Sequence, residues 1–146
     1  MNLAIEIENI TKTYPGVLAN SDVSISVNSG SIHAIVGENG AGKSTLMKIL
    51  YGMVKPDSGS IQIFESKANM SSPKDAINLG IGMVHQHFML AKNLTVLENI
   101  ILGIDKPLLK NIKLSKYKSE IKKVMDLYSL NINLNQYIDE LSVGEK

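Results

Sequence analysis

Apolar and polar residues alternate in two stretches near the beginning of the chain. The apolar positions of residues 3–10 recur every second residue, and those of residues 23–27 do the same. A period of two is typical of a β-strand that buries one of its faces. The sequence therefore predicts two half-buried strands, which we expect to pair in antiparallel fashion.

Two other segments are apolar with little alternation. Residues 32–36 and residues 81–85 are short runs of this kind, which favours strands buried on both faces of a sheet. A further short strand is predicted at residues 60–64, after a turn rich in Pro, Asp, Ser and Gly. Together these elements indicate an α/β fold with an antiparallel β part.

Four helices are predicted, from apolar residues at helical spacing or from residues that begin and end a helix. Residues 44–51 form the first helix, and a second begins where Ser72 precedes Pro73 and ends at Gly80. Residues 95–102 and 115–130 carry apolar side chains at helical intervals. We therefore predict a core domain over residues 1–88 and a helical subdomain over residues 89–146.

The segment between the strand at 32–36 and the first helix has a specific pattern. It reads Gly-Glu-Asn-Gly-Ala-Gly-Lys-Ser, which fits G-x-x-x-x-G-K-[ST], the phosphate-binding loop or Walker A motif. Glycines let the backbone turn tightly and aim its N–H groups at phosphate oxygens, and the following helix points its positive end at the anion. The candidate nucleotide-binding residues are Gly37, Glu38, Asn39, Gly40, Ala41, Gly42, Lys43, Ser44 and Thr45.

The chemistry of the motif gives two of these residues distinct tasks. Lys43 can reach the β- and γ-phosphates as a point charge, and the Ser44 hydroxyl can ligate Mg²⁺. The alternative is a glycine-rich turn without a ligand. A strand before the motif and a helix after it favour the phosphate loop.

Composition narrows the function classes. The net charge of +1, with no basic stripe, argues against a nucleic-acid partner. All fifteen basic residues are Lys, so these residues supply no arginine finger, and the absence of Cys excludes disulfides and thiolate metal sites. No apolar run approaches the 18 or so residues of a membrane span, so we expect any membrane association to run through a partner.

Histidines offer a weak alternative metal site. His85 and His87 stand two residues apart, a spacing that on a strand places both imidazoles on one face. Two nitrogens without a third ligand make a poor zinc site. His33 stands alone within its predicted strand. We therefore expect no metal at the histidines.

Four segments in order resemble those of one protein family. These are Tyr14, the phosphate loop, residues 82–86 (Gly-Met-Val-His-Gln) and residues 141–145 (Leu-Ser-Val-Gly-Glu). Their order and rough spacing are similar to the adenine-stacking aromatic, Walker A loop, Q-loop and signature of the ATP-binding cassette ATPases. The resemblance covers the whole chain and implies ATP and Mg²⁺ as ligands, with Lys43 in catalysis.

The resemblance also implies roles for four residues outside the loop. Tyr14 would stack on the adenine ring, and Gln86 would contact Mg²⁺ or the attacking water and link the site to a membrane partner. The alternative for Tyr14 is packing at the end of a strand. The alternative for Gln86 is that of an ordinary polar residue capping a strand. Ser142 and Gly144 would contact the γ-phosphate of ATP bound by an opposing cassette.

The signature differs from its commonest form, Leu-Ser-Gly-Gly-Gln, at Val143 and Glu145. Glu145 would repel phosphate if it pointed inward. The variant Leu-Ser-Val-Gly-Glu-Lys nevertheless resembles the ATPase subunits of bacterial nucleoside and simple-sugar importers, and so does Gly-Met-Val-His-Gln-His-Phe. Subunits of that group carry two cassettes in tandem.

The resemblance thus implies an energy-coupling ATPase at the cytoplasmic face of a membrane. Its expected partners are transmembrane permease subunits, a second cassette and, indirectly, a periplasmic or lipoprotein substrate-binding protein. A Walker B strand ending in Asp-Glu and a later catalytic His do not occur in residues 1–146. We therefore expect the N-terminal part of a longer enzyme, which alone hydrolyses ATP poorly or not at all and exposes unpaired apolar strands. A soluble cassette protein of translation or DNA repair and a naturally short nucleotide-binding regulator are the alternatives.

Overall fold

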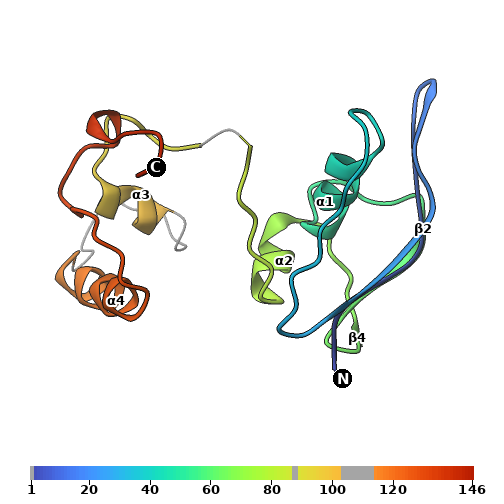
Figure 1. The fold of residues 1–146 in the computed structure, drawn as a ribbon, viewed down its shortest axis with the longest axis horizontal. Helices are drawn as coiled ribbons and strands as arrows, with labels where there is room; N and C mark the ends of the chain where they lie inside the picture. Colours follow the sequence, from blue (N-terminus) through green and yellow to red (C-terminus); the bar gives the residue numbers. More distant parts are fainter. Residues whose placement is uncertain (1, 87–88, 103–113) are drawn as a thin grey trace. The chain divides into compact units, whose positions relative to one another are not determined.

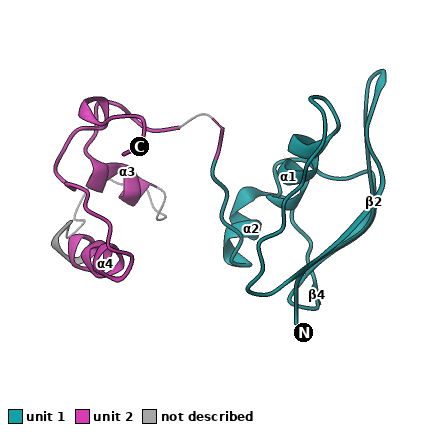
Figure 2. Cartoon of the chain, viewed as in Figure 1, with its two compact units in different colours: residues 1–84 teal, residues 85–146 magenta. Residues whose placement is uncertain are grey.

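The computed structural model describes residues 2–86, 89–102 and 114–146. These residues form two compact units, Met1–Val84 and His85–Lys146 (Figures 1 and 2). The division falls close to residue 88, where the sequence pattern changes from mixed to helical. Gln86, which was predicted to end a strand of the core, lies in the second unit.

The first unit is built on a long β-hairpin. Strand β1 (Leu3–Tyr14) pairs antiparallel with β2 (Val17–Asn28), and β1 also pairs with β3 (Ser58–Ile63). The short strand β4 (Ser66–Lys67) completes an antiparallel sheet of order β2-β1-β3-β4. The predicted strands at 3–10, 23–27 and 60–64 are confirmed, and the first two extend to the tight turn that joins them.

Two helices belong to this unit. Helix α1 (Lys43–Leu50) follows the phosphate loop, and α2 (Pro73–Asn78) begins after Ser72. The Ser72 hydroxyl accepts a hydrogen bond from the Asp75 amide, and the Asp75 carboxylate accepts from the amide and hydroxyl of Ser71 and from the Ser72 hydroxyl. Hydrogen bonds from Ser71 and then Ser72 lower the pKa of Asp75. The predicted cap and the Pro at the first position are confirmed.

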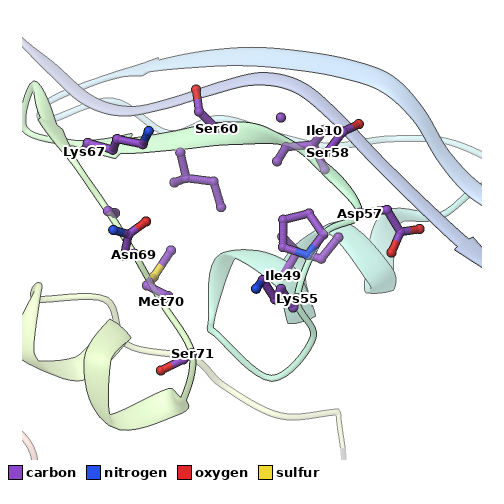
Figure 3. Close-up of a pocket in the computed structure, with 14 residues that line it drawn as sticks. Ile10, Ile49, Lys55, Asp57, Ser58, Ser60, Lys67, Asn69, Met70 and Ser71 are labelled. Carbon is purple, nitrogen blue, oxygen red and sulfur yellow. The ribbon is translucent and has the colours of Figure 1, made fainter.

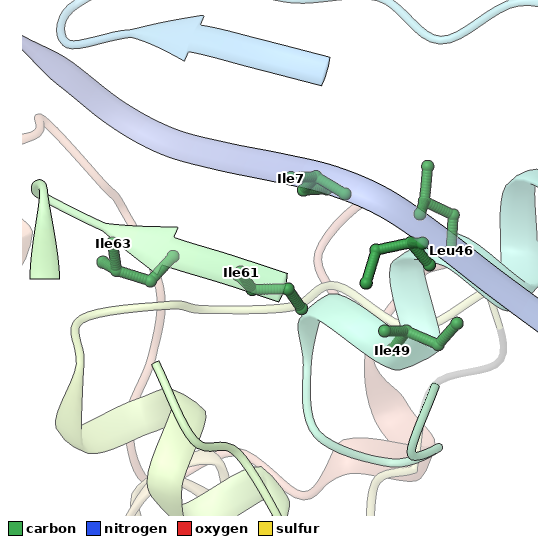
Figure 4. Packing of buried hydrophobic residues seen from close by; sticks show 6 residues of the cluster. Ile7, Leu46, Ile49, Ile61 and Ile63 are labelled. Atoms are coloured by element: carbon green, nitrogen blue, oxygen red, sulfur yellow. The ribbon is translucent and has the colours of Figure 1, made fainter. Parts of the chain in front are cut away.

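A compact apolar core joins the sheet to α1 (Figure 4). Strand β3 supplies side chains at alternate positions, and β1 supplies two side chains three residues apart, across an irregularity in its pairing with β2. Helix α1 supplies side chains three residues apart on its inner face. The buried residues are Ile7, Ile10, Leu46, Ile49, Ile61 and Ile63. Each such side chain contributes about 1.5–3 kcal/mol through burial, so α1 is fixed against the sheet mainly by these contacts.

The two apolar runs expected as buried strands do not form strands. Residues 32–36 and 81–85 have no strand assignment, and Ile32 and Val36 are 101% and 90% exposed. A strand buried on both faces needs hydrogen-bonded neighbours, and the sheet of the described residues is wholly antiparallel and ends at β2 and β4. This expectation was therefore wrong for the structure of residues 1–146, although both runs retain the apolar character of such strands.

The second unit is helical, with α3 (Val96–Leu102), α4 (Leu114–Leu127) and a short 3₁₀ helix η1 (Ile138–Glu140). Both longer helices were predicted. Their apolar faces and the following segment form a second core, whose buried members are Val96, Leu97, Ile101, Leu134, Ile138 and Leu141. No helix within the described ranges is long and apolar enough to cross a membrane.

Candidate nucleotide-binding site

Two glycines shape the phosphate loop. Gly40 and Gly42 have φ angles of 89° and 83°, in the left-handed region where a side chain is strained. A Cβ on Gly42 would lie 2.0 Å from the carbonyl oxygen of Ala19 on β2, whereas a Cβ on Gly40 would meet nothing within 4 Å. Gly42 is therefore required by its conformation and also by the close approach of β2.

The side chain of Lys43 folds back over the loop. Its ammonium Nζ donates to the carbonyl oxygens of Gly37 at 2.6 Å and Glu38 at 2.7 Å. The Ala41 amide also donates to the Glu38 carbonyl, at 3.2 Å. Both acceptors of the ammonium are backbone carbonyls of the loop.

Helix α1 begins directly at the loop, with Gly42 as its N-cap. The first N–H groups of an α-helix have no acceptor within the helix, and the helix dipole adds partial positive charge there. Ser44 lies exposed in this first turn, so its hydroxyl is accessible. A hydroxyl oxygen beside a phosphate-binding loop suits a hard cation such as Mg²⁺, so the donor set present fits the expected metal.

Tyr14 ends β1 at the turn of the hairpin, paired with Val17. Its side chain is 39% exposed, and the Lys12 ammonium lies 5.7 Å from the centre of its ring. Asn20, which contacts the loop, stands three residues after Val17, a step of about 10 Å along the strand. Tyr14 and Asn20 therefore lie on the two strands of the same hairpin.

An ion pair fixes the backbone beside Tyr14. Asp57 accepts hydrogen bonds from the Lys12 ammonium at 2.6 Å and from the Thr13 amide at 2.7 Å. The hydrogen bond from Lys12, followed by that from Thr13, lowers the pKa of Asp57. The turn before β3 is thereby tied to the end of β1 that carries Tyr14.

The remaining predicted site residues lie in the second unit. Gln86 is exposed at a bend, and Ser142 and Gly144 are exposed near the end of the chain. His87 lies outside the described residues. No group of three His, Cys, Asp or Glu side chains suited to a metal ion occurs in the part of the chain that the structure describes.

The signature segment carries an internal cap. One carboxylate oxygen of Glu145 accepts from the Ser142 amide at 2.9 Å and from the Ser142 hydroxyl at 2.6 Å. The hydroxyl bond and then the amide bond lower the pKa of Glu145. Glu145 thus occupies both the amide and the hydroxyl of Ser142.

Sequence reasoning missed two features here. The Ser142-to-Glu145 cap fits the S/T-x-x-E capping-box pattern, and so does the reciprocal pair of Thr95 and Glu98 before α3. That pattern could have been found from the sequence. The contact of Asn20 with Gly42 spans 22 residues and had no local signal.

A separate cavity of about 430 Å³ lies between β3, the end of α1 and the segment before α2 (Figure 3). It is lined by apolar residues such as Ile49 and Met70 and by polar ones such as Ser58 and Asn69. None of its lining residues belongs to residues 37–45. The cavity is therefore distinct from the phosphate loop.

The loop, its lysine and the helix that follows Gly42 define a phosphate-loop nucleotide-binding protein. Comparison with known proteins narrows this class. Residues 20–146 match the family model described as ABC transporter. The chain belongs to the ABC transporter family.

Curated relatives are similar over almost the whole chain. A guanosine import ATP-binding protein of Bacillus subtilis is 44% identical over 99% of this chain, and a nucleoside import ATP-binding protein of Lactococcus lactis is 43% identical over 97%. A ribose import ATP-binding protein of Hahella chejuensis is 40% identical over the full chain. The chain spans only 28% or 29% of the length of these relatives.

Solved structures agree on the fold. An ATP-binding cassette of an ABC transporter in its ADP conformation superposes with a TM-score of 0.81 at 28% identity, covering 99% of this chain and 61% of that one. A nucleotide-free ATP-binding cassette gives the same TM-score at 29% identity, covering 98% and 60%. The cassette fold predicted from the sequence is confirmed.

Proposed function

We propose that residues 37–45 bind the phosphates of ATP and that the chain is the nucleotide-binding part of an energy-coupling ATPase subunit. The observation that carries this proposal is the geometry of Lys43, whose ammonium is held over the loop by the carbonyls of Gly37 and Glu38. A cation presented by a flexible side chain beside left-handed glycines is the arrangement that phosphoryl groups require.

The remaining assignments follow the family pattern. Tyr14 would stack on adenine, and Ser44 would hold Mg²⁺. The contact of Gln86 with Mg²⁺ or the attacking water stays a prediction from the family pattern. Exposure of Tyr14 and Ser44 in the first unit supports the first two assignments. Ser142 and Gly144 contact the γ-phosphate held by an opposing cassette, supplied by a tandem repeat or by a second subunit.

The chemistry of this segment is positioning and charge stabilisation. Mg²⁺, when bound, neutralises charge on the β- and γ-phosphates. The loop amides and the first turn of α1 orient the phosphates, and Lys43 stabilises the charge that develops on the transferred group. Because residues 1–146 contain no strand that ends in Asp-Glu, we expect them alone to bind nucleotide without appreciable turnover.

The transported substrate is proposed to be a nucleoside or a simple sugar. The relatives named above import guanosine, nucleosides or ribose. Permease subunits would receive the motion of the closing cassettes at the cytoplasmic face of the membrane, and a substrate-binding protein would deliver the substrate from outside. This reading is favoured over a soluble cassette protein because the chain has no nucleic-acid-binding basic stripe.

The test compares two lysines of the same helix in the full-length protein. Lys43→Ala should abolish ATP binding at this loop and strongly reduce ATP-dependent uptake of radiolabelled guanosine or ribose into membrane vesicles. Lys48→Ala is the control, because Lys48 is an exposed residue in the last turn of α1. Unchanged ATP binding in Lys43→Ala would contradict the loop assignment. ATP binding without uptake of either substrate class would contradict the importer assignment.

A further inference from the structure

Asn20 is the one polar side chain buried among the residues that the structure describes, with 6% exposure. It lies on β2, beside the phosphate loop and next to Ala19, whose carbonyl approaches Gly42. A buried amide is unfavourable unless hydrogen bonds compensate for its loss of water. The burial of a polar amide at position 20 therefore requires an explanation.

The amide makes one direct contact with the loop. Its Nδ2 donates to the carbonyl oxygen of Gly42 at 3.3 Å, and the same carbonyl accepts the first bond of α1 from the Leu46 amide at 2.9 Å. Two donors from different elements thus hold one carbonyl. The end of the phosphate loop is fixed both by its own helix and by the hairpin.

Holding this carbonyl also orients a phosphate-binding donor. A peptide unit is planar, so the carbonyl of Gly42 and the N–H of Lys43 point in opposite directions along one rigid plane. Asn20 therefore sets the direction of the Lys43 amide through the carbonyl it binds. That amide stands at the start of α1, where the loop presents its donors.

The packing leaves little freedom for another arrangement. A Cβ on Gly42 would lie 2.8 Å from Asn20 Nδ2, so the asparagine and the glycine fill the space between them. Turning the amide by half a rotation would bring Oδ1, an acceptor, against the Gly42 carbonyl, another acceptor.

The other end of the amide has no such contact. Asn20 Oδ1 is buried and has no hydrogen-bond partner among the described residues. A leucine, which branches at the same atom, would avoid this unsatisfied oxygen. The donor contact with Gly42 is what the asparagine adds at this site.

We infer that Asn20 is a positioning residue of the phosphate loop, which aims the Gly42–Lys43 peptide at the β-phosphate of a bound nucleotide. This inference rests on the proposed nucleotide-binding function. It assigns to β2 a part in phosphate binding that lies outside the loop motif.

The experiment measures ADP and AMP binding by calorimetry in the full-length protein. Asn20→Leu keeps the branching of the side chain and removes the donor, and Asn20→Asp removes the donor and adds a negative charge. We expect ADP affinity to fall about tenfold in Asn20→Leu, the value of one hydrogen bond to a binding group, and further in Asn20→Asp. AMP lacks the β-phosphate, so its affinity should change by less than about twofold in Asn20→Leu.

Two further variants complete the design. Lys43→Ala defines the binding signal that belongs to this loop. Asn28→Asp makes the same chemical change at an exposed position of β2 and should leave ADP affinity unaltered. Thermal unfolding of each variant shows whether the fold is retained.

The outcomes separate this inference from the function on which it rests. Equal loss of ADP and AMP affinity in Asn20→Leu would show a merely structural role and overturn the inference. Unchanged ADP affinity in both Asn20 variants would overturn it as well, while leaving the loop assignment intact. Absence of ADP binding at this loop in the unaltered protein would overturn the proposed function and this inference together.

Discussion

The phosphate loop and the signature segment both present a serine among small residues, but they are held in different ways. The loop is fixed by contacts from distant parts of the sequence, since Ala19 and Asn20 of β2 pack against Gly42. The signature segment is fixed locally, because Glu145 caps Ser142 three residues earlier.

This difference predicts how each segment responds to change. The geometry of the loop depends on the β-hairpin and on core packing, so it should resist changes in pH and tolerate few substitutions. Within the signature, the geometry of residues 142–145 depends on the exposed Glu145 carboxylate and should respond to protonation and to single substitutions, whereas Leu141 is buried in the second core. The following predictions test that contrast, beginning with the largest effect.

The two apolar cores should lose about the same stability when one buried isoleucine of each is truncated. Ile49 and Ile101 are almost fully buried, one in each unit. Ile49→Ala and Ile101→Ala should each cost about 2–5 kcal/mol of the stability of their own unit, through lost burial and a residual cavity. Residue-level hydrogen exchange measures this loss in each unit.

The control for the core prediction is Ile77, which is 56% exposed on α2. Ile77→Ala removes the same atoms from a partly solvated position and should cost far less than Ile49→Ala. Equal protection losses for Ile49→Ala and Ile77→Ala would contradict the core as described.

The next effect concerns the glycines of the phosphate loop. Gly42→Ala should cost about 2–4 kcal/mol, because left-handed strain adds to a clash with the backbone of β2, and it should abolish nucleotide binding at the loop. Gly40→Ala has the strain without the clash and should cost only about 1–2 kcal/mol. Denaturant unfolding and ATP titration measure the pair, and equal costs would refute the role given to β2.

A smaller loss of stability is expected when the cap at the start of α3 is removed. The Thr95 hydroxyl accepts from the Glu98 amide, and the Glu98 carboxylate accepts from the Thr95 amide at 2.8 Å. Thr95→Ala should cost about 1 kcal/mol of helix stability, whereas Thr95→Ser should cost little, since serine caps as well. Hydrogen exchange of the α3 amides distinguishes the two variants.

The smallest effect is the titration of the signature cap. The pKa of Glu145 is lowered by its bonds to Ser142, so the cap is fully present above the ordinary glutamate pKa and is lost as the pH falls through the lowered pKa. An NMR titration should show the Ser142 amide shifting with a midpoint below the ordinary pKa of a glutamate.

Glu145→Gln removes the charge and should abolish this titration. The Ser71 amide, which donates to Asp75, should keep its own titration in the same variant and serves as the control. A Ser142 amide that titrates identically in Glu145→Gln would contradict the cap.

Much of this architecture could be predicted because its signals are local. The alternation of β1, the Ser72 and Pro73 helix start and the phosphate motif each depend on neighbouring residues. The expected strands at 32–36 and 81–85 failed because a strand requires a hydrogen-bonded partner, which apolar character alone does not supply. Asn20 was missed for the same reason, since its meaning depends on a contact 22 residues away.

The central claim is that the Lys43 ammonium, now shared between two loop carbonyls, belongs to a phosphate site. The most direct test is an experimental structure of the full-length protein with bound Mg·ADP. We predict that the β-phosphate lies within hydrogen-bond distance of Lys43 Nζ and of the amides that follow Gly42. A nucleotide bound elsewhere, with Lys43 still held by the carbonyls of Gly37 and Glu38, would contradict the account.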